Sequence, residues 1–400
     1  MKPMHTSHYP HSPSRILMTA DASEGVWSYV MELAAALRSS GTDILLAVMG
    51  PQLSPEQRAQ ATRFVHVGLC EKPFALEWME DPWHDVTQAG DWLLELEEQF
   101  EPHVIHLNHY CHGSLPWSSP VMISAHGCVL SWRKAVYGEQ SLHPSWHRYH
   151  TEVSAGLRGA NLVIAPTCAM IDSLTRLYAP ASRVNHFQNG SRAAEFRAIP
   201  FGCDAVRFQP MMKREYVLCV GTPGDKTQNL EMLDTLAHDL PWPVVLGCKG
   251  PFADIRCTAL PRLHALHATN AAEMASAQCQ ASIFALPTRY DPFGIAPLEA
   301  ALAGCALVLG NIPSLRETWG DAALFASADD EDAFAAVLHG LIDDGDLRRE
   351  MAGRARAHAL QMTPERMANS ILECYRELSS QPASPVEMDT RKRPSAIAAQ

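Results

Sequence analysis

The chain has 400 residues, which is too long for a single domain core and suits two domains. Hydrophobic residues make up 47% of it, as is normal for a globular protein. Its formal net charge of −12 disfavours a nucleic-acid partner, because binding to phosphate backbones requires clustered lysine and arginine. No apolar run reaches the roughly 18 residues that a membrane-spanning helix needs, so we expect at most peripheral contact with a membrane.

The ends of the chain and its cysteines bear on where the protein works. The N-terminal residues lack the apolar core of a secretory signal, so we expect a cytoplasmic protein. Residues 1–14 and 379–400 are rich in proline, serine or charge, and we expect disordered tails there. The 11 cysteines include no C-x-x-C pair and lie mostly in apolar stretches, which favours buried free thiols over a metal site.

The first half of the chain alternates predicted strands and helices. An apolar strand at 16–19 leads into a polar loop at 21–25, and residues 26–37 carry apolar side chains at helical spacing. A second strand at 44–48 completes a strand–helix–strand unit, which requires a parallel sheet with a right-handed crossover. The series continues with strands at 104–107, 121–124 and 162–165 and helices at 92–100, 147–157 and 168–178.

The second half repeats this alternation from residue 216. A strand at 216–220 ends at Gly221, and a helix follows at 229–236. Two such series predict two doubly wound α/β domains. The irregular connection between them, at about 185–214, is long enough for one more strand. Further strands are predicted at 244–246, 282–286 and 306–309, and closing helices at 331–342, 346–359 and 364–378.

Ligands bind beyond the carboxyl ends of the strands in open α/β sheets, so the loops there are the candidate site. The most informative is residues 289–299, R-Y-D-P-F-G-I-A-P-L-E, which leads from a strand into a helix. Gly294 allows close backbone approach, and the free N–H groups of the helix start favour a phosphate. Asp291 and Glu299, eight positions apart, could hold hydroxyls at the two ends of a diphosphate ligand. For Glu299 taken alone, a favourable charge at the helix start is the alternative.

The stretch D-P-F-G-I-A-P-L-E-A-A-L-A-G-C-A-L-V-L-G at 291–310 resembles the E-x7-E signature of retaining family-4 glycosyltransferases, present here as D-x7-E. The resemblance extends over about residues 15–378 and implies the B-type glycosyltransferase fold, in which two Rossmann-like domains face a cleft. It implies an acceptor domain at 15–195, a nucleotide-sugar domain at 196–362 and a last helix at 363–378 that crosses back to the first domain.

The resemblance also implies roles for residues of the second domain. Glu299 resembles the carboxylate that binds the ribose hydroxyls, and Asp291 takes the place of the first glutamate, which contacts the donor sugar. Phe293, Gly294 and Ile295 resemble the loop whose backbone meets the donor. Catalytic and donor-binding roles are therefore expected at this signature.

In the first domain, Gly25 resembles the glycine beside the donor diphosphate. His126, in an H-G pair after a predicted strand, resembles the histidine beside the reacting sugar carbon. The alternative for His126 is a structural histidine whose hydrogen bonds are satisfied in a strand-end loop. Both residues lie where the first-domain strands end, as the site requires.

Several positions depart from the family pattern. The usual Gly-Gly is Glu24-Gly25, the usual Gly-Arg is Gly221-Thr222, and the usual lysine before an asparagine is Gln228. The family arginine and lysine neutralise the donor diphosphate, so this chain lacks two cations and adds one carboxylate. Lys226 or Arg192 could supply the missing charge, and Gly221, Thr222 and Lys226 are the expected donor-binding residues of this loop.

The resemblance implies metal-independent transfer of a hexosyl group, with retention, from a nucleoside-diphosphate sugar to an acceptor hydroxyl in glycan or glycoconjugate biosynthesis. No resident cofactor is expected, and the acceptor could be a glycan, a lipid-linked sugar or a small molecule. The departures keep a second class open, a catalytically weak or inactive binding or regulatory relative. Five tryptophans of the first domain could stack on acceptor sugars or belong to its core: Trp78, Trp83, Trp117, Trp132 and Trp146.

Overall fold

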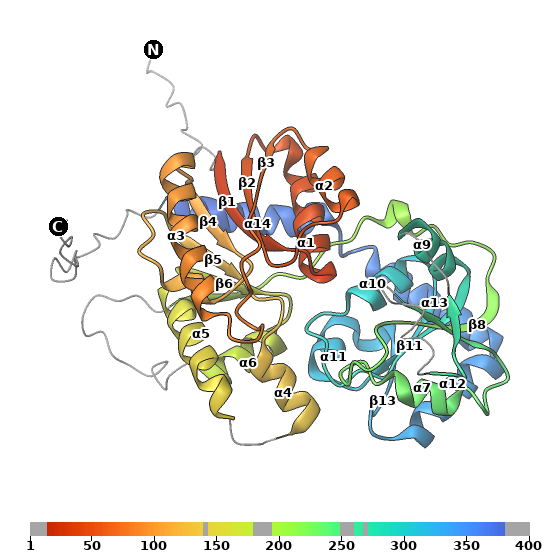
Figure 1. Cartoon of the computed structure of the whole chain (residues 1–400). Helices are drawn as coiled ribbons and strands as arrows, with labels where there is room; N and C mark the ends of the chain where they lie inside the picture. The colour runs from red at the N-terminus through yellow and green to blue at the C-terminus, as the bar shows by residue number, and fades with distance from the viewer. Residues whose placement is uncertain (1–13, 139–142, 179–193, 249–259, 267–270, 381–400) are drawn as a thin grey trace, which may run out of the picture.

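The computed structural model describes residues 14–138, 143–178, 194–248, 260–266 and 271–380. Both predicted tails fall almost entirely outside these ranges, as does Arg192. The chain forms two α/β domains, each built on a parallel sheet (Figure 1). The predicted fold class, two Rossmann-like doubly wound domains, is confirmed.

The first sheet has seven parallel strands in the order β3-β2-β1-β4-β5-β6-β7. Its strands are β1 (Arg15–Asp21), β2 (Asp43–Met49), β3 (Val67–Glu71), β4 (Val104–Leu107), β5 (Val121–Ser124), β6 (Leu162–Ala165) and β7 (Glu195–Ala198). The helices around it are α1 (Glu24–Ala36), α2 (Pro55–Thr62), α3 (Trp83–Phe100), α4 (Val129–Tyr137), α5 (His147–Gly159) and α6 (Cys168–Tyr178). The interdomain connection supplies β7, which extends the first sheet past residue 195.

The second sheet has six parallel strands in the order β10-β9-β8-β11-β12-β13. They are β8 (Arg214–Val220), β9 (Val244–Gly247), β10 (His264–Leu266), β11 (Ala281–Leu286), β12 (Ala306–Gly310) and β13 (Leu324–Ala326). Its helices are α7 (Leu230–Leu236), α9 (Ala271–Gln280), α10 (Ile295–Leu302), α11 (Pro313–Trp319), α12 (Glu331–Asp343) and α13 (Gly345–Ala359). In both sheets the strand order reverses beside the first strand, which places a ligand crevice at the β1/β4 and β8/β11 ends.

The last helix, α14 (Pro364–Ser379), returns from the second domain and packs on the first, beside α1 and β4 (Figure 1). Thr363 caps its start, and Tyr375 is fully buried. The Tyr375 hydroxyl lies 2.6 Å from Nδ1 of His106 on β4. This buried polar contact fixes the position of the helix on the first domain.

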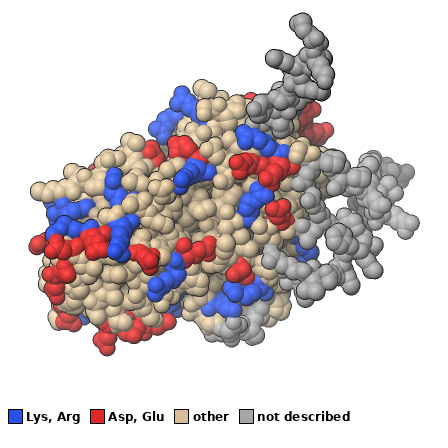
Figure 2. Space-filling view, turned by 180° about the vertical axis from the view of Figure 1, so that it is seen from behind, with Lys and Arg blue, Asp and Glu red and all other residues tan. Residues whose placement is uncertain are grey.

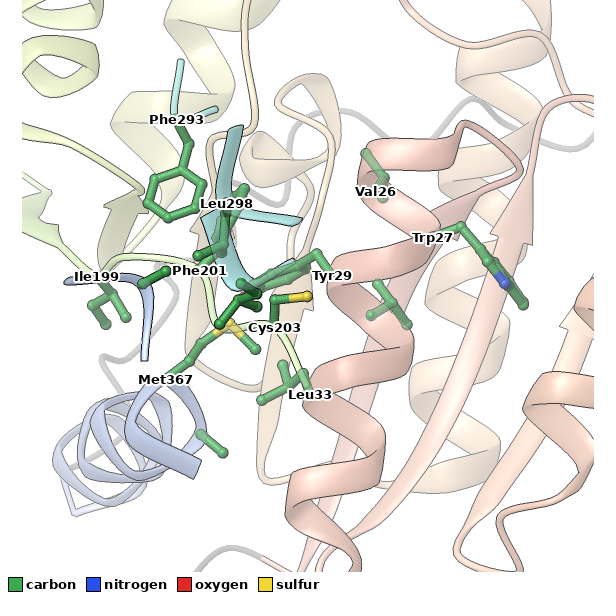
Figure 3. Packing of buried hydrophobic residues seen from close by; sticks show 14 of the residues in the cluster. Val26, Trp27, Tyr29, Leu33, Ile199, Phe201, Cys203, Phe293, Leu298 and Met367 are labelled. Atoms are coloured by element: carbon green, nitrogen blue, oxygen red, sulfur yellow. The ribbon is translucent and has the colours of Figure 1, made fainter. Parts of the chain in front are cut away.

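The two domains meet in an apolar cluster that includes Tyr29 of α1, Phe201 of the connection, and Phe293 and Leu298 of the second domain (Figure 3). The centroid of the Phe201 ring lies 4.9 Å from that of Tyr29 and 5.1 Å from that of Phe293. Burial of these side chains gives the cleft an apolar floor. Burying a large apolar side chain stabilises by about 1.5–3 kcal/mol, so the floor helps to hold the domains together.

The surface charges and the helices add two observations. On the face shown in Figure 2, lysine and arginine are interspersed with aspartate and glutamate. Within the described ranges, no helix has the length and apolar character needed to cross a membrane.

The cysteines differ in their state. The expectation of free thiols is wrong at Cys248, which is disulfide-bonded. Cys219 and Cys305, for example, are free and buried.

Candidate functional site

The loop after β1 forms the first part of the site. Asp21 is fully buried at the end of β1, where it accepts the Ser23 N–H at 2.6 Å and faces His109 Nε2 at 3.1 Å. Burial would raise the pKa of Asp21, but His109 and Ser23 more than offset this and hold it below its usual value. Gly25 follows in the first turn of α1, where an added Cβ would meet no atom within 4 Å. Open space therefore borders Gly25; the side chain of Glu24 lies outside the described part.

His126 lies just beyond β5, next to the apolar floor. Its ring packs edge-on against Tyr29 at 4.7 Å and obliquely on Phe201 at 5.3 Å, measured between ring centroids. Nε2 lies 2.6 Å from Oδ1 of Asn108, whereas Nδ1 is buried and has no partner among the described residues. Burial lowers the pKa of His126 to about 3, so the ring is neutral at physiological pH. His66, His109 and His112 share this unpartnered Nδ1, so it does not by itself separate a functional histidine from a structural one.

The signature loop of the second domain reaches across to this histidine loop. The Tyr290 hydroxyl accepts the backbone N–H of Cys128 at 3.1 Å, at the start of α4. Thr167, just before α6, donates its hydroxyl hydrogen to the Pro292 carbonyl at 3.0 Å. The Glu317 carboxylate accepts the N–H groups of Cys168 and Ala169 at 2.6 and 2.8 Å. The second domain thus caps the N-termini of two first-domain helices, α4 and α6.

Asp291 bonds its own loop. Its Oδ1 accepts the N–H groups of Phe293 at 3.0 Å and Gly294 at 2.6 Å. Burial raises the pKa of the carboxyl, while these two N–H groups act in the opposite direction. Gly294 caps α10 with a φ of +90°, and a Cβ there would lie 2.8 Å from Leu315 Cδ2, so only glycine fits. The short aspartate side chain is therefore used to shape the loop that precedes Ile295, the first residue of α10.

Glu299 lies in the second turn of α10, and the first turn holds no acidic residue. Its position does not suit a charge at the helix start, because that effect is confined to the first turn. Oε2 of Glu299 accepts a hydrogen bond from Gln278 at 3.2 Å. The pKa of Glu32 on α1 is raised, mainly by burial and further by the Glu299 carboxylate, and Glu32 pairs with Arg207. Glu299 therefore lies close enough to Glu32 of the first domain for the two charges to interact.

The loop after β8 holds the residues where cations were expected. Oε1 of Gln228 accepts the Thr222 N–H at 2.7 Å. It lies 2.3 Å from where a Cβ on residue 221 would be, so a larger residue there would displace the Gln228 side chain. Lys226 is exposed, with its Nζ 5.4 Å from the centroid of the Tyr137 ring on α4. Gln228 thus holds its own loop closed, and Lys226 lies beside the other domain.

Two contributors to the site, and one arginine beside it, were not identified from the sequence. Asn108, which bonds His126, follows the predicted strand 104–107, so the rule of strand ends could have found it. Tyr290 lies inside the signature, but its reach to the other domain has no sequence signal. Arg289, next to it, bonds Asp329 and the carbonyls of Ala328 and Lys226 and does not extend into the cleft as a free cation.

The tryptophans and one cavity complete the surroundings. Trp117 belongs to the core, with its Nε1 donating to the His112 carbonyl, whereas Trp78 is 37% exposed and lies 5.6 Å from the His109 ring. Phe201 and Phe293 also line a cavity of about 370 Å³ between the connection, α11 and α14. In the part of the chain that the structure describes, no group of three or more His, Cys, Asp or Glu could hold a metal.

Two family models match the chain. "Glycosyl transferase 4-like domain" matches residues 24–190, and "Glycosyl transferases group 1" matches residues 260–358. The chain belongs to the family-4 glycosyltransferases. Gly25 and His126 lie in the first matched segment of the chain, and Asp291 and Glu299 in the second. The loop at 221–228, where the expected cations are missing, lies outside both.

The curated relatives of the chain match it over segments of very different length. It is 34% identical over 98 residues to the O-antigen chain mannosyltransferase B of Escherichia coli, covering 24% of this chain and 26% of that protein. It is 22% identical over 368 residues to a glycogen synthase of Mycobacterium tuberculosis, covering 83% of this chain and 86% of that protein. It therefore spans about a quarter of the length of the first relative and most of the second.

Solved structures share the fold. Sucrose-phosphate synthase from Thermosynechococcus elongatus has a TM-score of 0.73 at 15% identity, covering 91% of this chain and 99% of that one. HepE of Anabaena, solved in complex with UDP and glucose, has a TM-score of 0.69 at 14% identity, covering 91% of this chain and all of the other. At such identities the likeness shows the arrangement of the two domains.

Proposed function

We propose that this chain transfers a hexosyl group from a nucleoside-diphosphate sugar to an acceptor hydroxyl, with retention and without a metal, in cytoplasmic glycan or glycoconjugate synthesis. The observation that carries the proposal is the meeting of His126 and the signature loop across the strand ends of both sheets, with Tyr290 bonded to Cys128. In the reaction the bond between the sugar C1 and the diphosphate breaks, the acceptor oxygen bonds C1, and the hydroxyl proton leaves with the diphosphate.

Each wall of the cleft has a part in this reaction. The start of α10 offers backbone N–H groups to the diphosphate, and the open space at Gly25 lets a phosphate approach the start of α1. Glu299 accepts hydrogen bonds from the ribose hydroxyls. His126 contacts the sugar near the reacting carbon, and the exposed ring of Trp78 is suited to stack on an acceptor sugar. Catalysis then rests on positioning and on stabilising the departing charge.

The relatives suggest which donors to test first. HepE was solved with UDP and glucose, and other relatives are named mannosyltransferase and glycogen synthase. Uridine- and adenosine-diphosphate glucose and guanosine-diphosphate mannose therefore head a screen of the purified protein by mass spectrometry, with glycan, lipid-linked and small-molecule acceptors. Product formation with any pair supports the proposal, and no product from any pair despite nucleotide binding contradicts it.

The nucleotide part of the proposal has its own test in Glu299→Ala. A carboxylate that accepts ribose hydroxyls contributes about 1.5–3 kcal/mol per hydrogen bond, so nucleotide binding should fall below detection in calorimetry while the protein stays folded. Glu331→Ala is the matched control, because Glu331 is an exposed carboxylate in the first turn of α12. Unchanged affinity of Glu299→Ala would remove the residue from the donor site.

One observation favours a second candidate, a catalytically weak or inactive relative that binds nucleotides and has a regulatory role. Gln228 and Asp291 both bond their own loops, and Thr222 is neutral where the family carries a charge. The donor site thus has fewer groups for a diphosphate sugar. Nucleotide binding that is equally strong with and without the sugar, together with no transfer, is the result that this alternative predicts.

A further inference from the structure

Two cations, one from each domain, lie over the ring of Tyr137 at the end of α4. The Arg133 guanidinium of α4 and Nζ of Lys226, in the loop after β8, each lie 5.4 Å from the centroid of this ring. Arg133 also lies 5.8 Å from the centroid of the Trp146 ring. We call these four residues the cation–aromatic cluster. Figure 1 shows α4 on the side of the first domain that faces the second, so the cluster joins the two domains.

Further aromatic side chains support the cluster. Trp132 packs edge-on against Tyr137, and Tyr149 packs edge-on against Trp146, with 5.8 Å between the ring centroids in both pairs. Tyr149 is buried, and Trp132 and Trp146 are half-buried, whereas Tyr137 is 39% exposed. The Tyr137 ring is therefore a supported and exposed surface, which suits stacking on a sugar.

The two cations of the cluster have no carboxylate partner. Within the described ranges, neither Arg133 nor Lys226 forms an ion pair or donates a side-chain hydrogen bond. Asp225, next to Lys226, instead accepts the backbone N–H and the hydroxyl of Thr227, at 2.9 and 2.5 Å. Other arginines commonly pair with carboxylates: Arg58, Arg197, Arg207, Arg349 and Arg354. The aromatic rings thus hold the two cations in place and leave their N–H groups available to an anion.

The place of the cluster along α4 favours the acceptor over the donor. The start of this helix is bonded by Tyr290 of the signature loop, beside the proposed reaction centre. Tyr137 ends the helix, roughly 12 Å further along its axis. In the proposed function the donor lies between the start of α10 and Glu299, so a ligand that reaches the end of α4 is the acceptor.

The charge of the protein favours an acidic ligand at this place and no other cause for the cluster. The formal net charge of the chain is −12, so an anion is repelled by the protein as a whole and requires local cations. A membrane surface is also anionic, but Trp132 and Trp146 are half-buried against neighbouring rings and do not protrude to enter it. An acidic sugar uses both the exposed ring and the cations.

We propose that the cation–aromatic cluster binds an acidic sugar of the acceptor, with its ring on Tyr137 and its carboxylate or phosphate bonded by Arg133 and Lys226. The inference rests on the proposed function and names the chemical class of its acceptor, an anionic glycan. The negative charge has two sources, a uronic acid or a sugar phosphate. Lys226 then serves the acceptor and leaves the donor diphosphate to other groups.

Calorimetry with three sugar probes tests this site without any transfer reaction. Trigalacturonate carries carboxylates, glucose 6-phosphate carries a phosphate, and maltotriose is neutral. The wild type should bind at least one acidic probe about tenfold more tightly than maltotriose, with a smaller difference in high salt. Binding of trigalacturonate alone identifies a uronic acid as the source of the charge, and binding of glucose 6-phosphate alone identifies a phosphate.

Glutamine variants remove the two cations one at a time. Arg133→Gln and Lys226→Gln should each weaken binding of the acidic probe about tenfold, the loss of one charge-assisted contact, and should leave nucleotide affinity unchanged. Arg63→Gln is the matched control, because Arg63 is an exposed arginine at the end of α2, which packs beside the edge strand β3. Tyr137→Phe keeps the ring and should bind as the wild type does, whereas Tyr137→Leu should lose about threefold.

The inference is overturned if the wild type binds neither acidic probe more tightly than maltotriose, or if both glutamine variants bind like the wild type. Loss of nucleotide affinity in Lys226→Gln would also overturn it, because the lysine would then belong to the donor site. So would weaker binding of the glutamine variants to phosphatidylglycerol vesicles with sugar binding unchanged, since the cluster would then contact a membrane.

Failure of this inference differs from failure of the proposed function. Selective binding of an acidic probe by a wild type that transfers no sugar contradicts the proposed function and leaves the acidic-sugar site in place. Transfer to neutral acceptors, without preference for an acidic probe, contradicts the inference alone. With an acidic acceptor, Arg133→Gln should raise the KM of the acceptor about tenfold and leave the KM of the donor unchanged.

Discussion

On the first-domain wall of the cleft, Gly25 borders open space, and the His126 ring, whose Nδ1 has no partner in the described part of the chain, lies beside the apolar floor. On the second-domain wall, Asp291 and Gln228 both accept hydrogen bonds from the backbone of their own loops. The first wall therefore offers a ligand open space beside its backbone at Gly25, whereas polar side chains of the second wall are engaged within the protein. The residues that depart from the family pattern in the second wall have taken structural roles, and the donor would rely there on backbone groups and Glu299.

The strongest test of the first wall is His126→Ala. If His126 contacts the sugar near the reacting carbon, turnover should fall about a hundredfold, whereas donor affinity should change less than about threefold. Steady-state kinetics and calorimetry measure the two quantities separately. An equal loss of turnover and affinity would assign His126 to binding alone.

The second wall can be tested by adding the missing cation with Thr222→Arg. The side chain of Gln228 still bonds the backbone N–H in this variant, so the loop should keep its shape. A charge-assisted contact with the diphosphate is worth about 1.5–3 kcal/mol, so donor affinity should rise about tenfold to a hundredfold, with a smaller gain in high salt.

Adding Gln228→Lys to this variant supplies a second charge but removes the acceptor of the Thr222 N–H. The double variant should therefore bind the donor more tightly than wild type and lose about 1 kcal/mol of stability. Donor affinity at two salt concentrations and urea unfolding check both effects. Tight wild-type binding with no gain in either variant would show that another cation, such as Lys226, already serves the diphosphate.

Acid should weaken the first domain because His106 is buried as a neutral ring. Burial lowers its pKa to about 3, whereas the unfolded value is about 6.5, so the unfolded state binds more protons between these values. Stability should then be flat above pH 6.5 and fall as the pH drops, by about 2 kcal/mol from this group at pH 5. Urea unfolding at pH 7 and pH 5 measures the loss.

The variants His106→Gln and His238→Gln separate this effect from general acid sensitivity. His238 is exposed, with 77% of its side chain accessible, and its replacement should leave the pH dependence unchanged. His106→Gln should be less stable at pH 7 but should lose less stability on acidification. If both variants lose as much as the wild type, the proton uptake belongs to other groups.

Gly25→Ala has the smallest expected effect and separates binding from folding. A Cβ at this position meets no protein atom, so stability should stay the same or rise by about 0.5–1 kcal/mol. Donor affinity should nevertheless fall about tenfold if a phosphate occupies the space beside the glycine. Gly340→Ala on α12 is the matched control, because its Cβ would also meet nothing. Unchanged donor affinity in Gly25→Ala would place the phosphate elsewhere.

Much of the fold could be predicted because strand and helix periodicity is a local property. The predicted strands at 121–124 and 162–165 match β5 and β6. Prediction missed β3, α2 and α4 in the first domain and β10, β13, α9 and α11 in the second, segments that are short or only partly apolar. Half-buried β3 alternates weakly, and α2 is mostly polar, although Ser54 and Gln57 form a capping box at its start that the sequence could have revealed.

The sequence by itself determined the two α/β series, the loops at their strand ends and the D-x7-E signature, because each depends on residues close together in the chain. Only the tertiary structure decided which of these side chains are free. Asn108 and His126 are 18 residues apart and meet because β4 and β5 are neighbours in the sheet. Tyr290 reaches Cys128, 162 residues away, because the domains close on each other. Whether a polar atom is satisfied depends on such distant partners, and local sequence carries no record of them.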